Sequence, residues 1–356
     1  MPEALEVVRS ATMRSDKQRS INSKVLGAGG AAYDFELCAA TYDELMRGAI
    51  FSDADWSTAV NISKTDVAAV TSGNVMTCVA GWAGNNIAVG QWIYVDGFTG
   101  TTANNGWHQV TALSGTSLTV RGITLVDDAA GETVTVKGSQ LLNGSTQSSY
   151  SVQQHYVDQT NKYHNLLGAR IDSFGVDISS GAIVSGNVAF TSLSRNEATA
   201  TIGSGSPTAA AGNTVISEAD GFGKLSYAYT HPSYDIMGMS VSIATGARPR
   251  KPLGSQAYTQ IQQNALEVTG TLEVYLEDGT WALDTALEAF TKNGMAFDLV
   301  QGSNRFHFHF PKIVFTGEPN DLGGVDSDIM LSLSWEAEVA AHYTGGSEQT
   351  VQITRV

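Results

Sequence analysis

Positively charged residues are scarce in this chain. Of its 356 residues, 20 are Lys or Arg and 35 are Asp or Glu, which leaves a formal net charge of −15. Binding to DNA through its phosphates requires clustered positive charge, so a chain this acidic is a poor candidate for that role. Charged residues make up only 15% of the chain, below the roughly 25% usual for soluble domains. Together with 37 glycines, this composition indicates strands and turns with a small, polar surface that suits a large assembly.

Cysteine and long hydrophobic runs are also rare. The two cysteines, Cys38 and Cys78, each lie in an alternating apolar run, so we expect buried free thiols and no disulfide. The first residues contain no apolar core of the kind that a signal peptide requires. No run of 18 apolar residues is present that would cross a membrane as a helix. We therefore expect a protein made in a reducing cytosol, with no membrane partner.

Local motifs for catalysis or cofactor binding are missing as well. Gly27–Gly30 resembles the start of a dinucleotide-binding pattern, but the residues after it alternate as in a strand, which predicts a flexible glycine loop instead. His307 and His309 share one face of a strand with no Cys, Asp or Glu beside them, so we interpret them as surface or interface histidines. The sequence thus predicts no catalytic residue, no metal and no cofactor, although a triad of distant residues would leave no local motif.

Residues 62–139 differ from the rest of the chain in their sequence pattern. Five short strand-like runs alternate with turn residues, and no helical period occurs among them. This pattern predicts a self-contained small β-barrel or β-sandwich module. Its tryptophans Trp82, Trp92 and Trp107 are interpreted as core residues, and stacking on sugars is the alternative. The five runs are Asn74–Val79, Gln91–Val95, Trp107–Ala112, Ser117–Val120 and Thr133–Lys137.

The rest of the chain repeats one order of elements twice: strand, basic loop, strand, helix, strand, hairpin. We expect two tandem units of about 140 residues, each a mainly β sandwich or barrel with one helix. The helices are expected at 42–49, opened by a Thr41/Glu44 capping box, and at 280–292, stopped by Asn293-Gly294. An apolar side of the second helix is expected to include Trp281 and Phe290. The predicted division is 1–61 and 140–212 for the first unit, 62–139 for the inserted module, and 213–356 for the second unit.

The two basic loops occupy equivalent places in these units. We expect their side chains to reach acidic surface on a neighbouring subunit or ring, with solvated loop charge as the alternative. The residues are Arg14, Lys17, Arg19 and Lys24 in the first loop and Arg248, Arg250 and Lys251 in the second.

Several of these segments resemble the major tail tube proteins of long, flexible-tailed bacteriophages. A polar arm, Arg14–Arg19, leads into a strand, Tyr33–Leu37, and a helix, Thr41–Arg47, that is followed by an aromatic residue, Trp56. Tyr150–His155, Ile171–Ile178 and Gly186–Phe190 resemble the next strands of that family. The resemblance covers about residues 1–57 and 145–340, and leaves out the inserted module, which is similar to the small β-domains that such proteins carry on the tube exterior.

This resemblance implies a structural virion protein and not an enzyme. Its rings would stack into a hollow tail tube that encloses a tape-measure protein and later conducts DNA, without specific binding, through an acidic lumen. Tail terminator and distal tail proteins would be further partners, and assembly would occur in the host cytoplasm. Because family members with one unit per chain form rings of six, two units per chain favour a homotrimer, with a hexamer as the alternative.

Two other interpretations of the sequence remain open. The three tryptophans of residues 62–139 are compatible with a virion surface adhesin or carbohydrate-binding module. The tube proteins of contractile injection systems share the fold of the tail tube family, so a tube of that kind is the second alternative. An inserted module on the outer surface favours a tail without an enclosing sheath.

Overall fold

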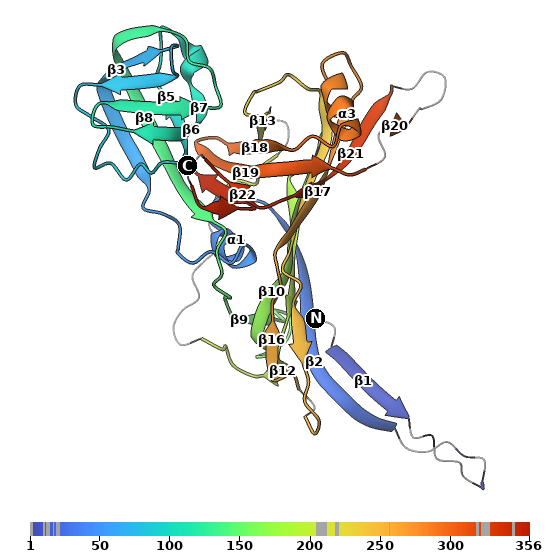
Figure 1. Ribbon diagram of the computed structural model, residues 1–356. Coiled ribbons are helices and arrows are strands. Elements are labelled where there is room, and N and C mark those ends of the chain that lie inside the picture. Colours follow the sequence, from blue (N-terminus) through green and yellow to red (C-terminus); the bar gives the residue numbers. More distant parts are fainter. Residues whose placement is uncertain are drawn as a thin grey trace.

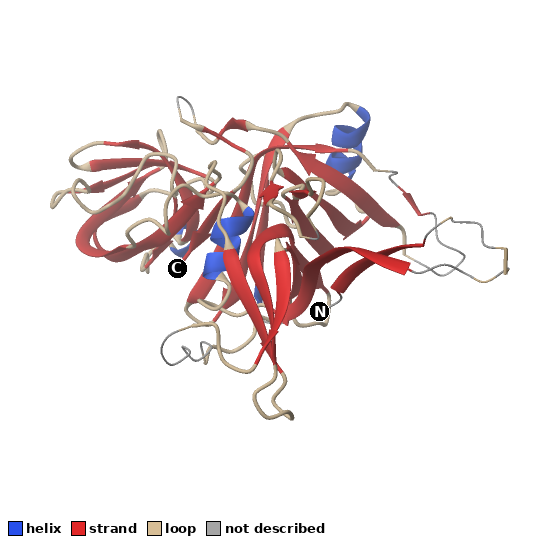
Figure 2. Cartoon of the chain, turned by 90° about the horizontal axis from the view of Figure 1, so that it is seen from below, coloured by secondary structure: helices blue, strands red, loops and turns tan. Residues whose placement is uncertain are grey.

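The protein is mainly β, as the sequence predicts (Figures 1 and 2). Among the described residues, helices are limited to α1 (Asp43–Ala49), α3 (Trp281–Glu288) and one 3-10 turn (Thr102–Asn104). The computed structural model describes residues 3–9, 11, 15–16, 18, 22–203, 212–217, 221–255, 257–317, 320–321, 328–343 and 346–356.

Six strands close into a small barrel. Its strand order is β3-β4-β7-β6-β5-β8, and β8 returns to pair with β3. The barrel has a core of its own, in which Trp82, Phe98 and Val136 are buried. This core contains only residues between Val60 and Val136, which agrees with the expected self-contained module. The strands are β3 (Val60–Val70), β4 (Val75–Cys78), β5 (Trp92–Asp96), β6 (Gly106–Leu113), β7 (Ser117–Arg121) and β8 (Asp128–Leu142).

The main sheet contains two sets of four strands that are paired in the same order. The first set is β1-β2-β11-β10, and the second is β14-β17-β21-β19. All these pairs are antiparallel, and pairing of β10 with β14 joins the two sets into one sheet. The first set comprises β1 (Glu3–Arg9), β2 (Asn22–Glu36), β11 (Ser185–Thr191) and β10 (Tyr163–Ser179). The second comprises β14 (Ile236–Ala244), β17 (Glu267–Tyr275), β21 (Met330–Ala337) and β19 (Asn304–Phe315).

The strands beside these sets repeat in the same way. β9 (Tyr150–His155) precedes and pairs with β10, as β18 (Asn293–Gln301) precedes and pairs with β19. β12 (Ser194–Ala198) then pairs with the first residues of β10, and β24 (Gln352–Arg355) pairs with the first half of β19. The repeated order seen in the sequence is therefore a repeat of strand pairing. The remaining strands are β13 (Phe222–Tyr227), β15 (Arg248–Arg250), β16 (Gln260–Gln262), β20 (Asn320–Asp321), β22 (Ala340–Ala341) and β23 (Glu348–Gln349).

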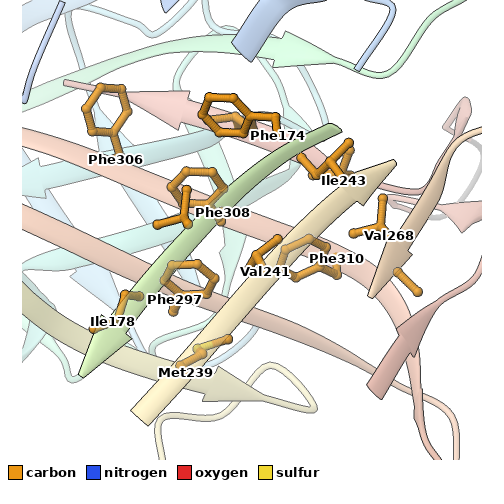
Figure 3. Packing of buried hydrophobic residues seen from close by; sticks show 14 of the residues in the cluster. Phe174, Ile178, Met239, Val241, Ile243, Val268, Phe297, Phe306, Phe308 and Phe310 are labelled. Atoms are coloured by element: carbon orange, nitrogen blue, oxygen red, sulfur yellow. The ribbon is translucent and has the colours of Figure 1, made fainter. Parts of the chain in front are cut away.

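The main core lies where the paired strands β10 and β14 cross the paired strands β18 and β19 (Figure 3). Apolar residues of β10 and β14, such as Phe174 and Val241, face Phe308 and Phe310 of β19 (Figure 3). Phe308 stacks on Phe297 of β18 with ring centroids 5.0 Å apart, and Phe310 packs on Trp335 at 4.9 Å. In β10 and β14 the period-two alternation buries one side chain in two, which leaves the other face of these strands to polar residues. Both faces of β19 are buried.

Both helices lie near their expected places, but their ends differ from the predictions. The capping box is wrong, because Tyr42 is the N-cap and no side chain caps the helix. Glu44 instead accepts a hydrogen bond from Arg47 Nε at 2.9 Å. The predicted glycine stop of the second helix is also wrong, since Asn293-Gly294 opens β18. Each helix is followed by a phenylalanine in the left-handed region, Phe51 (φ 55) and Phe290 (φ 50), at the same distance from Thr41 and Thr280.

Two further predictions concern small residues. Cys38 and Cys78 are buried free thiols, as predicted. The glycine loop is wrong, because β2 runs through Gly27–Gly30 as a continuous strand. A Cβ atom at Gly29 would lie 2.7 Å from Leu166 Cδ2, so at this position glycine permits close packing of β2 against β10.

Candidate functional site

One face of the main sheet is polar and lies opposite the core. Cross-strand pairing places Glu36, Ser185, Asp177 and Ser240 in one row, which continues to Thr271 and Ser334. A parallel row begins at Asp34 and ends at Glu336. The small hydroxyl residues of these rows contact one another directly, as in the 2.8 Å hydrogen bond between Ser240 and Thr271. We call this surface the polar sheet face.

The polar sheet face carries negative charge. Its six acidic residues are exposed and come from four strands, β2, β10, β17 and β21. Among the described residues, cations lie at the margins of this face. Arg170 donates hydrogen bonds to Gln147 and Gln263, and Lys312 forms an ion pair with Glu338 beside Glu336. A mobile polyanion beside this surface would therefore be repelled and not bound. The six residues are Asp34, Glu36, Asp177, Glu267, Glu273 and Glu336.

The sequence analysis did not identify this acidic surface. Its signal was present in Tyr33–Glu36, where apolar and acidic residues alternate. Alternation assigns the acids to one face of a strand, but only the pairing of β2 with β11 and of β17 with β21 aligns them into one surface.

The basic residues lie in the connections β1–β2 and β14–β17, which are equivalent in the two strand sets. Arg14, Lys17 and Arg19 lie outside the described residues, and Lys24 lies on β2, where its side chain is not described. The expected second loop is a two-stranded ribbon, because β15 pairs with β16. Arg248, Arg250 and Lys251 are exposed on it, and Arg250 donates a hydrogen bond to Gln262. Leu253, near the tip of the same ribbon, is fully exposed.

Unpaired strand edges lie at both ends of the tandem sheet. Among the described residues, β1 pairs on one side only, with β2. At the far end, Val314 and Phe315 of β19 pair with β21, while pairing of β19 with β18 ends at Ile313. Exposed edges of this kind are templates for pairing with another chain.

His307 and His309 are not at the surface, contrary to one part of our interpretation. Both are buried in the chain's own junction between β19 and the barrel. The ring of His307 lies 4.4 Å from Trp92 and 4.6 Å from Trp107, centroid to centroid. Burial lowers the pKa of His307 well below its usual range and the pKa of His309 to about 3.

The tryptophans of the barrel are buried, as expected for core residues. Trp82 and Trp92 are fully inaccessible, and Trp107 is 3% exposed. Rings in this state offer no open surface for stacking on a sugar, which removes the observation that motivated the carbohydrate-binding alternative. The two that contact His307 instead join the barrel to the main sheet.

Polar contacts strengthen the same junction. Arg121 of β7 donates to Gln109 Oε1 at 2.6 Å and to the His342 carbonyl at 2.7 Å, and its guanidinium lies 3.7 Å from the ring centre of Tyr229. Beside the junction, within the main sheet, Asp298 of β18 accepts a hydrogen bond from the Lys224 amide of β13 at 2.6 Å. Burial raises the pKa of Asp298 to about 6. The barrel is thus fixed to the main sheet by side chains from several elements.

A pocket of about 470 Å³ lies between the barrel and the sheet and contains three cations, Lys137, Arg305 and Arg355. The charge of Arg355 is paired with Asp43 of α1, and its guanidinium lies 4.4 Å from the ring centre of Trp56. Arg305 lies over the ring of Tyr94 at 4.2 Å. Two of the three cations are therefore used in packing contacts within the chain.

No metal site is found among the described residues, since no group of three or more His, Cys, Asp or Glu side chains is placed to hold an ion. Within the same residues, every helix is too short or too polar to span a bilayer.

Comparison with known proteins gives one match. The family model described as phage tail tube protein matches residues 1–337, which is most of the chain and includes the barrel. No curated protein matches the chain.

Proposed function

Since the chain belongs to the phage tail tube protein family, we propose that its rings stack into a tube that encloses a tape-measure protein and later conducts DNA. Membership of this family makes it a structural component of a virion tail. The finer proposal is a long, flexible tail without a sheath, assembled in the host cytoplasm, with terminator and distal tail proteins at its ends.

We propose that the polar sheet face lines the lumen. The negative charge of this face is the observation that carries the proposal. Duplex DNA carries about one negative charge per 1.7 Å, so a basic wall would hold it along its whole length. Six exposed carboxylates on hydroxyl-rich strands give a wall that repels the backbone and offers few strong donors. DNA would then pass without specific binding.

Three copies are proposed to close each ring. Within the chain, β10 of the first strand set pairs with β14 of the second. The segment of β10 that pairs with β14 includes Val176, and its counterpart in the second set is Asn320 of β20. The same step taken between copies therefore places β1 of one copy beside β20 of another. A closed ring removes both exposed edges, and three copies give six strand sets. A ring of six copies is the alternative and would contain twelve.

The basic residues are proposed to hold neighbouring subunits or rings together. Arg248, Arg250 and Lys251 are exposed on the β15–β16 ribbon, and the chain as a whole is acidic. Their contacts would be with carboxylates of a stacked ring, and Arg14, Lys17, Arg19 and Lys24 would act in the same way from the β1–β2 connection. Solvated loop charge is the alternative.

The barrel of residues 62–139 is proposed to stand on the tube exterior as an inserted module. The first unit would then comprise 1–61 and 140–212, and the second 213–356. In support, the barrel packs on His307 and His309, which lie on the face of β19 that does not enter the main core. The burial of its tryptophans gives no support to a sugar-binding role.

Electron microscopy of the purified protein tests the proposal. We expect hollow tubes or rings, and native mass spectrometry should give a mass of three chains for an isolated ring. Tubes built from six-chain rings would refute the trimer and leave the tube function intact. A protein that stays monomeric at high concentration would contradict the function itself.

A further inference from the structure

The two strand sets carry matching helices whose aromatic residues have different exposures. Tyr42 of the first set corresponds to Trp281 of the second. Each directly follows a threonine, and ten residues after that threonine comes a phenylalanine with a left-handed backbone conformation. Phe51 is 6% exposed and Tyr42 stacks on Phe35 at 4.2 Å. Trp281 is 57% exposed and Phe290 is 58% exposed. We call Trp281 and Phe290 the α3 patch.

The first helix is covered from the second strand set. Arg355 of β24 forms an ion pair with Asp43 at the start of α1, and its guanidinium stacks on Trp56. Trp56 Nε1 in turn donates to the Asp43 carbonyl at 3.4 Å. In Figure 1, α1 lies beneath the barrel near the C-terminal strand, while α3 lies toward the other end of β19.

The end of α1 is also closed by the connection that follows the barrel. The amide of Gly144 donates to the Ile50 carbonyl at 3.2 Å, and the amide of Thr146 donates to the Phe51 carbonyl at 2.9 Å. The second strand set has no inserted barrel, so α3 has no such connection to cover it. Two large aromatic side chains more than half exposed, one at the start of a short helix and one just after its end, are a typical sign of a contact surface.

We propose that the α3 patch is covered by a second copy of this chain within the ring, through strand β12 and the residues beside it. The step from the first strand set to the second places β24 against α1. When the second set of one copy meets the first set of the next copy in the same way, β12 of the next copy lies against α3, because β12 corresponds to β24. This inference rests on the proposed ring and names the surface through which its copies meet.

Cross-linking tests this contact directly. Ala282 follows Trp281 on α3, as Asp43 follows Tyr42 on α1, and Ala198 ends β12, as Arg355 ends β24. In the double variant Ala282→Cys and Ala198→Cys, a short bismaleimide should join copies into covalent dimers and closed trimers. Each single variant should give no ladder, because the native Cys38 and Cys78 are buried.

Assembly of the variant Trp281→Ser/Phe290→Ser provides the second measurement. We expect the concentration for half-maximal ring formation to rise about tenfold or more, as for loss of central aromatic contacts in other interfaces. The control is Val79→Ser, which changes an apolar residue that is 84% exposed on the barrel. The α3 contact alone would be overturned by two results together. These are normal ring formation in the Trp281→Ser/Phe290→Ser variant and no cross-link in the cysteine pair. Absence of rings in the unmodified protein would instead contradict the proposed function.

Discussion

The imidazole of His307 stacks on the indole of Trp107, with ring centroids 4.6 Å apart and planes inclined by 26°. The same imidazole also contacts the indole of Trp92, with ring centroids 4.4 Å apart. Among the described residues, neither ring nitrogen of His307 has a hydrogen-bond partner. A neutral histidine therefore fills an apolar site at the junction of the barrel and the main sheet.

We expect the junction to weaken as the pH falls below about 6.5, the usual pKa of histidine. Burial lowers the pKa of His307 and His309, and lowers that of His108 to about 4. Folding then favours the neutral rings, so their contribution is complete above the unfolded pKa and is lost as the pH falls towards the folded pKa. Asp298, whose pKa is raised to about 6, opposes this change because its protonated form is favoured by folding. The other titratable or charged groups facing the junction are Arg121, Lys224, His231, Arg305 and His342.

Thermal unfolding between pH 7.5 and 5 measures this effect. The substitution His307→Phe keeps a ring between the two tryptophans and removes one titrating group, so the fall in Tm with acidification should become shallower. His155→Phe is the matched control, since His155 is exposed and also stacks on an aromatic ring, that of Tyr163. An equally steep fall in the His307 variant would contradict the assignment.

His307 and His309 show what a local sequence pattern can predict and what it cannot. Their spacing places both on one face of a strand, which is correct, and Phe306, Phe308 and Phe310 are buried on the other. The spacing does not say that a barrel formed far earlier in the chain, by residues 60–142, covers that face. The repeat is different, because it depends only on the order of elements along the chain, and the structure shows it as two strand sets paired in the same order. The acidic face required the register between strands, which a single sequence does not determine.

Removal of the barrel should leave tube assembly intact. Asn61 pairs with Lys137, and Val60 with Gly138, so the chain ends that border residues 62–139 are neighbours and a short Gly/Ser linker can join them. The deletion would expose the side chains of His307 and His309 to solvent, and both are polar and tolerate water. We expect thinner tubes by electron microscopy. A variant that fails to fold, judged by loss of cooperative unfolding, would indicate that the barrel is part of the wall.

Charge reversal on the β15–β16 ribbon should weaken tube formation without unfolding the protein. The variant is Arg248→Glu, Arg250→Glu, Lys251→Glu, at three exposed positions, where reversals have small effects on stability. Tube yield in the variant should fall, and the dependence of yield on salt should change, because a screened attraction is replaced by repulsion. Lys162→Glu, at another exposed loop, is the control. Equal yield and equal salt dependence would favour the alternative of solvated charge.

Reversal of charge on the polar sheet face should produce a tube that binds DNA, whereas the unmodified tube does not. The variant Asp34→Lys, Glu36→Lys, Asp177→Lys places three cations per chain on β2 and β10, the two strands that flank β11. Short duplex DNA should then sediment with assembled tubes at about 50 mM salt and be released at about 200 mM, since phosphate contacts weaken steeply with salt. The unmodified tube should bind none at either concentration. The matched control reverses Asp96, Asp158 and Glu348, which are exposed and lie outside both this face and α3. If its tubes retain DNA equally well, the effect comes from net charge and the lumen lies elsewhere.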